Sequence, residues 1–295
     1  IRQLGRMISE LSKAGVSVKR ISYIISSETE KDKPGALEPD MNGDIVFDHV
    51  SFAYENCPNI LNDVSFEIRA GTTFGILGAT GSGKSTMMYL LDRLYDLPPE
   101  NGKITVGGID ISDISAKWLR SRIGMVLQEP FMFSRTLEEN IGITADKAKL
   151  PEIREAASIA CLDDTVEQFA NGYDTFVGER GVTLSGGQKQ RAAIARMLVG
   201  KKPIMVFDDS LSAVDTETDA KIRAALAEKT AGATVILIAH RITTLMHADK
   251  IIVLDKGRVA EEGTHDELVA AGGLYAKIYS IQTGMLSDAD SAEGK

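Results

Sequence analysis

The stretch Gly78-Ala79-Thr80-Gly81-Ser82-Gly83-Lys84-Ser85 has the form G-x-x-x-x-G-K-[ST], and Thr86 follows it directly. An apolar, strand-like segment at 72–77 precedes this stretch, and apolar residues at helical spacing follow it from 87 to 94. The order strand, glycine loop, helix is the context in which this pattern indicates phosphate binding. The alternative is a glycine-rich turn with a chance lysine, and the flanking elements disfavour it.

The residue types of this loop suit a polyphosphate ligand. Glycines let the backbone turn its N–H groups inward, and the start of the helix adds the positive end of its dipole. Lys84 can reach the outer phosphates, and the Ser85 hydroxyl can ligate Mg²⁺. We therefore expect a nucleoside triphosphate as ligand, with the binding residues Gly78, Ala79, Thr80, Gly81, Ser82, Gly83, Lys84, Ser85 and Thr86.

The bulk composition bounds the class of protein. The chain has 295 residues, 43% of them hydrophobic and 25% charged, which is typical of a globular protein with a sizeable core. Its formal net charge of −9 argues against a general nucleic-acid binder, so no nucleic-acid partner is expected. Cys57 and Cys161 show no metal-binding spacing and indicate free thiols in a reducing compartment.

The start of the chain suggests a piece of a longer protein. No apolar run approaches the ~18 residues needed to span a bilayer. The first residue is Ile1 and no secretory signal is visible, so we expect a fragment or a processed chain.

Two kinds of strand pattern indicate two kinds of β-structure. Some segments alternate polar and apolar residues, whereas others are apolar on both faces and alternate with helices. The second kind indicates a parallel sheet covered by helices on both faces, and hence an α/β fold. The first kind is found at 44–54, 61–68 and, shorter, 104–108; the second is found at 204–207, 234–238 and 251–254.

Helical patterns fill much of the remaining chain. Residues 1–25 are compatible with a helix. The segment 136–200 is predicted to be helical, with a break at 184–188 from which a further helix starts at 189–199. Thr264 and Glu267 have the spacing of a capping box, which predicts a last helix extending through Tyr279.

Polar side chains follow three of the predicted strands. Asp208 and Asp209 come directly after one apolar run, His240 follows the next run, and Gln128 follows an earlier one. Ligands bind beyond the carboxyl ends of strands in an open parallel sheet, so we expect these groups near the phosphate loop. Asp208 has the form of a Walker B aspartate and should hold Mg²⁺ with Ser85 and Gln128. Asp209, His240 and Gln128 are the candidate catalytic residues for an attacking water and the γ-phosphate.

These motifs together resemble the ATP-binding cassette (ABC) nucleotide-binding domain. The resemblance covers about 44–282, and its most specific part is the signature Leu184-Ser185-Gly186-Gly187-Gln188. It implies a P-loop NTPase (RecA-like) core with an antiparallel β subdomain and an α-helical subdomain, and an ATPase that uses ATP and Mg²⁺. The resemblance also assigns Tyr54 to stacking on adenine. The motifs that carry it, in chain order, are the phosphate loop, Gln128, Leu184 to Gln188, Asp208-Asp209, Ser212 to Asp215, and His240.

Finer features resemble the exporter branch, in particular the segments 128–141 and Val177-Gly178-Glu179-Arg180-Gly181. The resemblance implies a location at the cytoplasmic face of the cell membrane, although the fragment itself should be soluble. It also implies a domain division. Residues 1–41 would be the end of the last transmembrane helix and a linker, 42–284 the nucleotide-binding domain with its helical subdomain at about 130–200, and 285–295 a disordered tail.

The signature residues imply a partner. Ser185, Gly186, Gly187 and Gln188 stand at a predicted helix start and form a second anion cradle, although one ATP needs only one cradle per fold. In the family, two nucleotide-binding domains pair head to tail, and each signature closes over the ATP of the other. The expected partners are therefore a second ABC domain and the transmembrane domain of an exporter.

Asp209 departs from the family pattern, in which glutamate usually follows the Walker B aspartate. A base must come within about 2.6–3.2 Å of the water it activates, so the shorter side chain should slow hydrolysis. The aspartate at this position resembles one half of heterodimeric exporters, in which one of the two ATP sites is degenerate and the partner is a different chain. The alternative is that the backbone compensates and Asp209 works normally.

Other functions remain open beside the export ATPase. A regulatory ATP-binding module with little turnover would share the fold and differ at Asp209. A DNA-repair or chromosome ABC protein is disfavoured by the acidic charge and by the compact interval between loop and signature. Small GTPases and kinases do not explain the signature.

Overall fold

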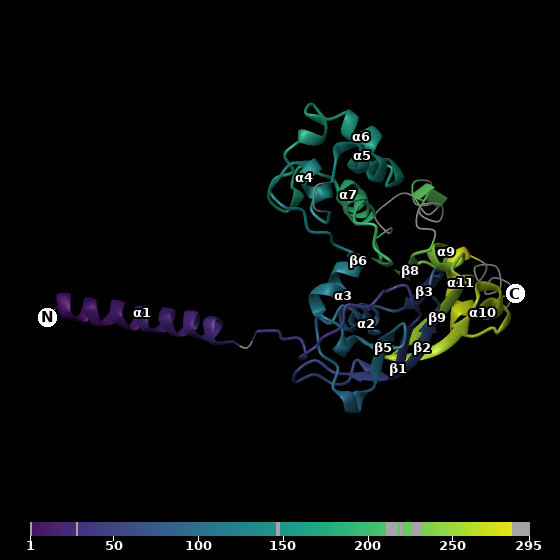
Figure 1. The fold of residues 1–295 in the computed structure, drawn as a ribbon, viewed down its shortest axis with the longest axis horizontal. Coiled ribbons are helices and arrows are strands. Elements are labelled where there is room, and N and C mark those ends of the chain that lie inside the picture. Colours follow the sequence, from purple (N-terminus) through teal and green to yellow (C-terminus); the bar gives the residue numbers. More distant parts are fainter. Residues whose placement is uncertain are drawn as a thin grey trace, which may run out of the picture. The chain divides into compact units, whose positions relative to one another are not determined.

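The computed structural model describes residues 2–27, 29–145, 148–210, 218, 221–222, 224–225 and 232–284. The chain divides into two compact units, Ile1–Pro34 and Gly35–Lys295 (Figure 1). The expected tail at 285–295 and the run Ser212 to Asp215 lie outside the described residues.

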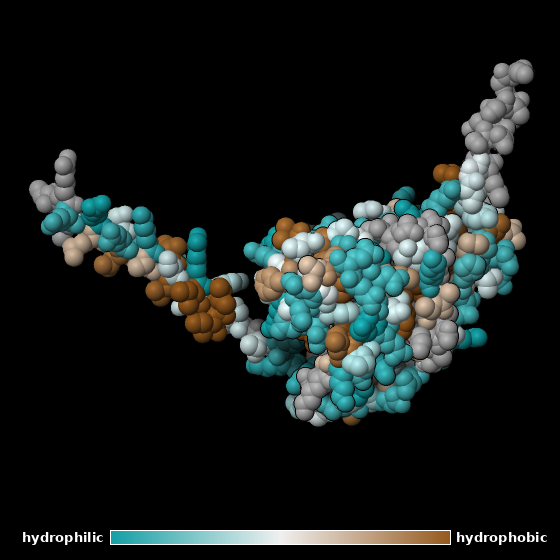
Figure 2. Space-filling view, turned by 90° about the horizontal axis from the view of Figure 1, so that it is seen from above, coloured by the Kyte–Doolittle hydropathy of each residue, from teal (hydrophilic) through white to brown (hydrophobic). Residues whose placement is uncertain are grey.

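The first unit consists of one long helix, α1 (Arg2–Ser26), which confirms the helix predicted for residues 1–25. Its apolar side chains are exposed, and Figure 2 shows them gathered toward one end of the helix. Ile21, Ile24 and Ile25 are 56%, 72% and 78% exposed. Among the described residues, every helix is too short or too polar to cross a membrane.

The second unit is built on a six-stranded sheet with the order β10-β9-β3-β8-β7-β6. Its strands are parallel except β10, which forms an antiparallel hairpin with β9. Every residue of β7 and β8 is buried, which explains their unbroken apolar runs. The strands are β3 (Thr73–Gly78), β6 (Ile123–Val126), β7 (Ile204–Asp208), β8 (Thr234–Ala239), β9 (Lys250–Asp255) and β10 (Arg258–Gly263).

A four-stranded antiparallel sheet with the order β2-β1-β4-β5 packs beside this core, and it confirms the expected antiparallel β subdomain. The register of β1 against β2 is interrupted between Phe47 and Val50, where His49 and Asp63 both adopt positive φ. The strands are β1 (Ile45–Phe52), β2 (Leu61–Ile68), β4 (Lys103–Val106) and β5 (Ile109–Asp110).

Helices cover the six-stranded sheet, and α4 to α7 form a separate helical layer beyond β6 (Figure 1). The helices of the second unit are α2 (Lys84–Leu91), α3 (Ala116–Arg122), α4 (Leu137–Gly142), α5 (Leu150–Ile159), α6 (Asp163–Glu167), α7 (Gly186–Val199), α9 (Ile242–Leu245), α10 (His265–Ala270) and α11 (Leu274–Thr283). Short 3₁₀ segments are Pro99–Asn101, Ile111–Asp113, Gly172–Asp174 and Glu179–Gly181.

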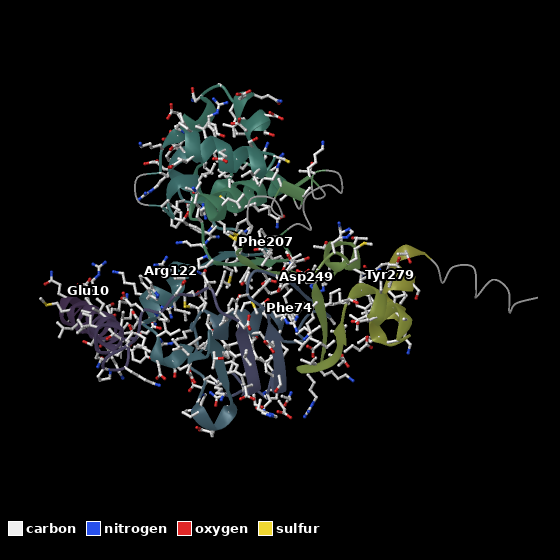
Figure 3. All side chains as sticks on the ribbon, turned by 45° about the vertical axis from the view of Figure 1, so that its right-hand side comes forward. Glu10, Phe74, Arg122, Phe207, Asp249 and Tyr279 are labelled. Atoms are coloured by element: carbon white, nitrogen blue, oxygen red, sulfur yellow. The ribbon has the colours of Figure 1, made fainter. Side chains whose placement is uncertain are left out.

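The two faces of the six-stranded sheet belong to two apolar cores. Alternate residues of one strand point to opposite faces, so Phe207 of β7 packs with the helical layer while Val206 packs toward β1 and β2. Phe74 of β3 lies in the second core, and Figure 3 labels both phenylalanines in the interior of the unit. A sheet covered on both faces holds its strand ends rigidly, and this rigidity positions the site.

The structure corrects two helix predictions. The segment 136–200 has more breaks than the one predicted at 184–188, because its described part contains four separate α-helices, and Gly172, Gly178 and Gly181 adopt positive φ between α6 and α7. The last helix is two helices, α10 and α11, separated at Gly272 with φ +67°.

The polar stretch expected to be a linker up to Met41 is already part of the second unit from Gly35 onward. The Leu37 N–H donates to the Asp113 carbonyl at 2.8 Å, and the Trp118 indole donates to the Pro39 carbonyl at 2.9 Å. Met41 is only 1% exposed. Backbone hydrogen bonds, which polarity does not reveal, fix this stretch.

Candidate functional site

The phosphate loop connects β3 to α2 at the carboxyl edge of the parallel sheet. Gly81 and Gly83 have φ of +81° and +102°, conformations that L side chains rarely adopt. A Cβ on Gly78 would lie 2.6 Å from the Ser82 hydroxyl and 2.7 Å from the Leu254 carbonyl. The loop is therefore a tight cradle that requires glycine at these positions.

Lys84, the first residue of α2, folds over this loop. Its ammonium donates to the carbonyls of Gly78 at 2.8 Å and Ala79 at 2.9 Å, and the residue is 6% exposed. Burial lowers the pKa of Lys84, and the charges of Asp208 and Asp209 oppose that shift. A buried cation therefore stands at the mouth of the cradle, where an anionic ligand would complete its coordination.

Ser85 and Asp208 meet although they lie far apart in sequence. The Ser85 hydroxyl donates to Oδ2 of Asp208 at 2.8 Å. Burial raises the pKa of Asp208, while the bond from Ser85 and the charge of Lys84 lower it. A hydroxyl and a half-desolvated carboxylate at this distance form an oxygen-ligand pair of the kind that Mg²⁺ prefers.

Asp209 adopts φ +46° immediately after β7, and its N–H donates to the Ile238 carbonyl at 2.8 Å. The Gln128 amide reaches its carboxylate, with Nε2 3.4 Å from Oδ2. His240 follows β8 directly. It is among the groups that lower the pKa of the Asp208 carboxyl. The structure thus brings Gln128, Asp208, Asp209 and His240 to one edge of the sheet.

Tyr54 lies beside the same helix α2. Its hydroxyl is 3.1 Å from the Thr86 hydroxyl, and its ring contacts Phe52 and Tyr95 edge to face, with centroids 5.1 and 4.9 Å away. Burial raises the pKa of the Tyr89 hydroxyl on α2, and the charges of Asp208, Tyr54 and Tyr95 add to that shift. These rings form an aromatic wall next to the phosphate loop, which suits a flat base.

The signature residues are placed differently. Ser185 caps α7, its hydroxyl accepts from the Gln188 N–H, and the Gln188 side chain accepts from the Ser185 N–H. Ser185 and Gly186 are exposed. No hydrogen bond between described residues joins Ser185–Gln188 to the phosphate loop. This second cradle is thus separate and faces outward from its own chain.

Two glutamines that the sequence reasoning missed support the loops of the site. Gln190 of α7 is 3% exposed and donates to the backbone carbonyl of Gln128 at 2.9 Å. Gln282 of α11 donates to the carbonyl of His240 at 2.7 Å. Neither residue belongs to a local pattern that predicts such a contact, so periodicity and spacing gave no signal.

The residues present fit a magnesium-bound triphosphate. The Ser82 hydroxyl is buried and has no hydrogen-bond partner within the described part of the chain. The first-turn N–H groups of α2 lack intrahelical acceptors by geometry and point toward the loop. Together with Lys84 and the Ser85–Asp208 pair, they offer donors for phosphate and oxygen ligands for a cation.

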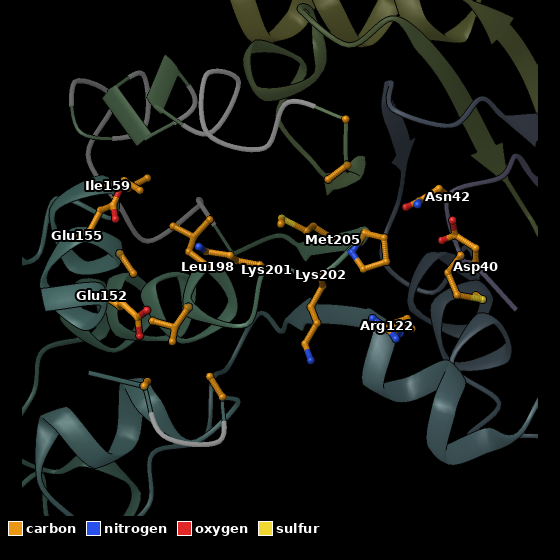
Figure 4. Close-up of a pocket in the computed structure, with 18 of the residues that line it drawn as sticks. Asp40, Asn42, Arg122, Glu152, Glu155, Ile159, Leu198, Lys201, Lys202 and Met205 are labelled. Carbon is orange, nitrogen blue, oxygen red and sulfur yellow. The ribbon is translucent and has the colours of Figure 1, made fainter. Parts of the chain in front are cut away.

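A cleft of about 1080 Å³ lies elsewhere, between the parallel sheet and the helical layer (Figure 4). Pro203 and Ala233, which line it, immediately precede β7 and β8, so the cleft is at the amino ends of the strands. Glu152, Lys202 and Arg122 give it charges of both signs. It is on the wrong edge for the nucleotide site, because ligands of such sheets bind at the carboxyl ends.

Comparisons with known proteins identify the family of this chain. The profile of the ABC transporter family matches residues 61–212. The uncharacterized ABC transporter ATP-binding protein YknU of Bacillus subtilis (strain 168) is 45% identical over 285 residues, which is 96% of this chain and 48% of YknU. The leukotoxin translocation ATP-binding protein LktB of Mannheimia haemolytica is 40% identical over 282 residues, 95% of this chain and 40% of LktB.

A solved structure of a bacterial Atm1-family ABC exporter with ATP bound matches with a TM-score of 0.87 and 39% sequence identity. The match covers 95% of this chain and 49% of that chain. The chain therefore spans about half or less of the length of the relatives that it matches.

Proposed function

Because this chain belongs to the ABC transporter family, we propose that it is the ATP-binding and ATP-hydrolysing domain that powers an exporter. One observation carries the proposal: the Ser85 hydroxyl lies 2.8 Å from the Asp208 carboxylate, under the cradle closed by Lys84. The two residues are brought together only by the fold, and they are the oxygen ligands that a magnesium triphosphate requires.

The proposed ligand is ATP. The α2 N-terminus and Lys84 bind the phosphates, and the half-buried Tyr54 ring, held by the Thr86 hydroxyl at 3.1 Å, stacks on the base. Mg²⁺ bound at Ser85, Asp208 and Gln128 would neutralise charge on the phosphate oxygens.

In the proposed reaction, Asp209 orients and deprotonates the attacking water, and His240 and Gln128 face the γ-phosphate. Gln128 Nε2 lies 3.4 Å from Oδ2 of Asp209, so the two side chains are close enough to contact the same water on one side of the pair. Asp209 is one methylene shorter than glutamate, and a setback of about 1 Å slows such a reaction by orders of magnitude. We propose that this chain binds ATP and hydrolyses it slowly.

The proposed partner is a second ABC domain, expected to be a different chain, paired head to tail. The exposed N-terminus of α7, with Ser185, Gly186 and Gly187, would close over the ATP of that partner, since anions bind at helix N-termini. Engagement of the two domains would drive the membrane helices between conformations.

Export across a membrane is supported by the relatives. LktB is named as a leukotoxin translocation protein, and the matching structure is an exporter. The exposed apolar side chains of α1, among them Ile21 and Ile25, suit a contact with the membrane domain of an exporter. We place the chain at the cytoplasmic face of a membrane.

A regulatory ATP-binding subunit is the second candidate, and Asp209 is the observation that favours it. In that case the site holds two domains together with little turnover, and the signature of this chain serves the partner's ATP.

The test is an ATPase assay of the chain with Asp209 and with Asp209→Glu. Slow turnover that rises at least about tenfold with glutamate supports a degenerate site. Strong activity without any gain from glutamate would refute degeneracy. Since Asp tolerates left-handed backbone better than glutamate, a melting curve of each variant serves as the folding control.

A further inference from the structure

The side chain of Gln282 forms hydrogen bonds with the backbone at His240 and at Ile242. It stands near the end of α11, and its Nε2 donates to the His240 carbonyl at 2.7 Å. Its Oε1 accepts from the Ile242 N–H, the first residue of α9, at 2.8 Å. One side-chain amide thus bonds both sides of a two-residue step, 40 and 42 positions away in sequence.

The geometry of this contact fixes the orientation of the main chain at His240. An amide presents a donor and an acceptor in one plane, and both are used here on the main chain. Neither bond involves the side chain of His240 or Arg241. The backbone at His240 is therefore held by bonds in which its imidazole takes no part.

The helix that carries Gln282 is itself anchored. Tyr275 is completely buried, and its hydroxyl lies 2.7 Å from Nδ1 of His265 on α10. The Glu261 carboxylate of β10 accepts the N–H groups of Leu274 and Tyr275 at the start of α11. Gln282 therefore reaches the segment between β8 and α9 from a support tied to the sheet.

We infer that Gln282 is a positioning residue: it orients His240 toward the γ-phosphate and so makes the site distinguish ATP from ADP. The inference rests on the proposed function, because it assumes that His240 faces the γ-phosphate. It adds a contribution of the C-terminal helix to nucleotide recognition.

A purely structural role makes a different prediction. If the two bonds only fasten the end of α11, their loss lowers the melting temperature and leaves the preference for ATP over ADP unchanged. If they orient His240, their loss weakens ATP binding and leaves ADP binding unchanged, because ADP has no γ-phosphate.

The experiment measures Kd for ATP and for ADP by calorimetry in the full chain and in Gln282→Met, which keeps the side-chain length and removes both polar groups. We expect the ratio of the ADP and ATP constants to fall about fivefold, the effect of losing one hydrogen bond. Thr283→Val is the matched control, because the Thr283 hydroxyl donates only within its own helix, to the Tyr279 carbonyl. It should leave the ratio unchanged.

A double-mutant cycle with His240→Ala shows whether Gln282 acts through His240. We expect His240→Ala to lower the ratio alone, and Gln282→Met to lower it no further in that background. Full additivity, or a Gln282→Met ratio equal to that of the original chain, would overturn the inference. If His240→Ala alone left the ratio unchanged, the role of His240 in the proposed function would fail, and the inference with it.

Gln282→Glu keeps the test decisive if the methionine variant does not fold. It retains the acceptor for the Ile242 N–H and loses the donor to the His240 carbonyl. Two acceptor oxygens then face each other, so we expect a lower melting temperature and a ratio that falls at least as far as for methionine. A preserved ratio in this variant also contradicts the inference.

Discussion

Replacing Gly83 with alanine places a methyl group at a crowded position of the phosphate loop. Gly83 precedes α2 with φ +102°, and its Cβ would lie 2.6 Å from Cδ2 of Leu61 and 3.3 Å from the Ile60 carbonyl. Left-handed backbone costs an L residue about 1–2 kcal/mol, and overpacking adds about 1–3 kcal/mol. The free energy of unfolding should therefore fall by about 2–5 kcal/mol.

Two assays report this change. For a unit of this size, ~3 kcal/mol lowers the melting temperature by roughly 6–12 °C. Where the loop moves to relieve the contact, the N–H groups that lead into Lys84 also move, so ATP binding should weaken by at least about tenfold. Thermal melting and calorimetric titration with Mg-ATP measure the two effects.

Gly186→Ala is the matched control. A Cβ at Gly186 meets no atom within 4 Å, and the residue begins α7 with ordinary helical backbone. Alanine there should lower neither the melting temperature nor the ATP affinity of the isolated chain. If Gly83→Ala behaved like this control, the account of the loop as a cradle closed to side chains would be wrong.

Three further changes test other contacts. The pKa of His49 is raised from its ordinary 6.5, chiefly by the hydrogen bond to Asp63, so the stability that this bond adds is complete below about pH 6.5 and is lost as pH rises through the raised pKa. His49→Gln should therefore reduce the change of melting temperature with pH between about pH 6 and 8. A pH dependence equal to that of the original chain would exclude this contribution. Gln190→Met removes the donor to the Gln128 carbonyl, so ATP turnover should fall. The melting temperature should stay within about 2 °C of the original, because the variant also removes the buried Oε1 of Gln190, which has no partner among the described residues. Equal turnover would contradict a supporting role of Gln190 in the site. Ser185→Ala removes the N-cap of α7 and should lower the free energy of unfolding in denaturant by about 0.5–2 kcal/mol. It should leave ATP binding by the isolated chain unchanged. Weaker ATP binding would mean that the signature contacts the ATP of its own chain.

The sequence predicted the parts of the site that local patterns encode. The motif from Gly78 to Ser85 lies within one loop, and the apolar runs before Asp208 and before His240 each lie within one buried strand. Each pattern can be recognised within about ten residues of sequence, so the place of these residues at one edge of the sheet could be predicted. The Ser85–Asp208 contact has the geometry that this expectation requires.

The missed features depend on residues distant in sequence. Gln282 lies beyond the predicted end of the last helix at Tyr279, and the break at Gly272 that redirects α11 has no periodic signal. The Tyr54–Thr86 bond and the packing of residues 35–41 likewise come from tertiary contacts. Side-chain amides and hydroxyls that bond to remote groups are satisfied only by the fold, so no local rule selects their partners.

The proposed nucleotide site is tested most directly by a calorimetric titration of the chain and of Lys84→Ala with Mg-ATP. We expect ATP to bind the original chain and to bind the variant at least about tenfold more weakly, since a hydrogen bond from a charged group is lost. Equal ATP affinity in the variant, or no ATP binding by the original chain, would contradict a nucleotide site built on this loop.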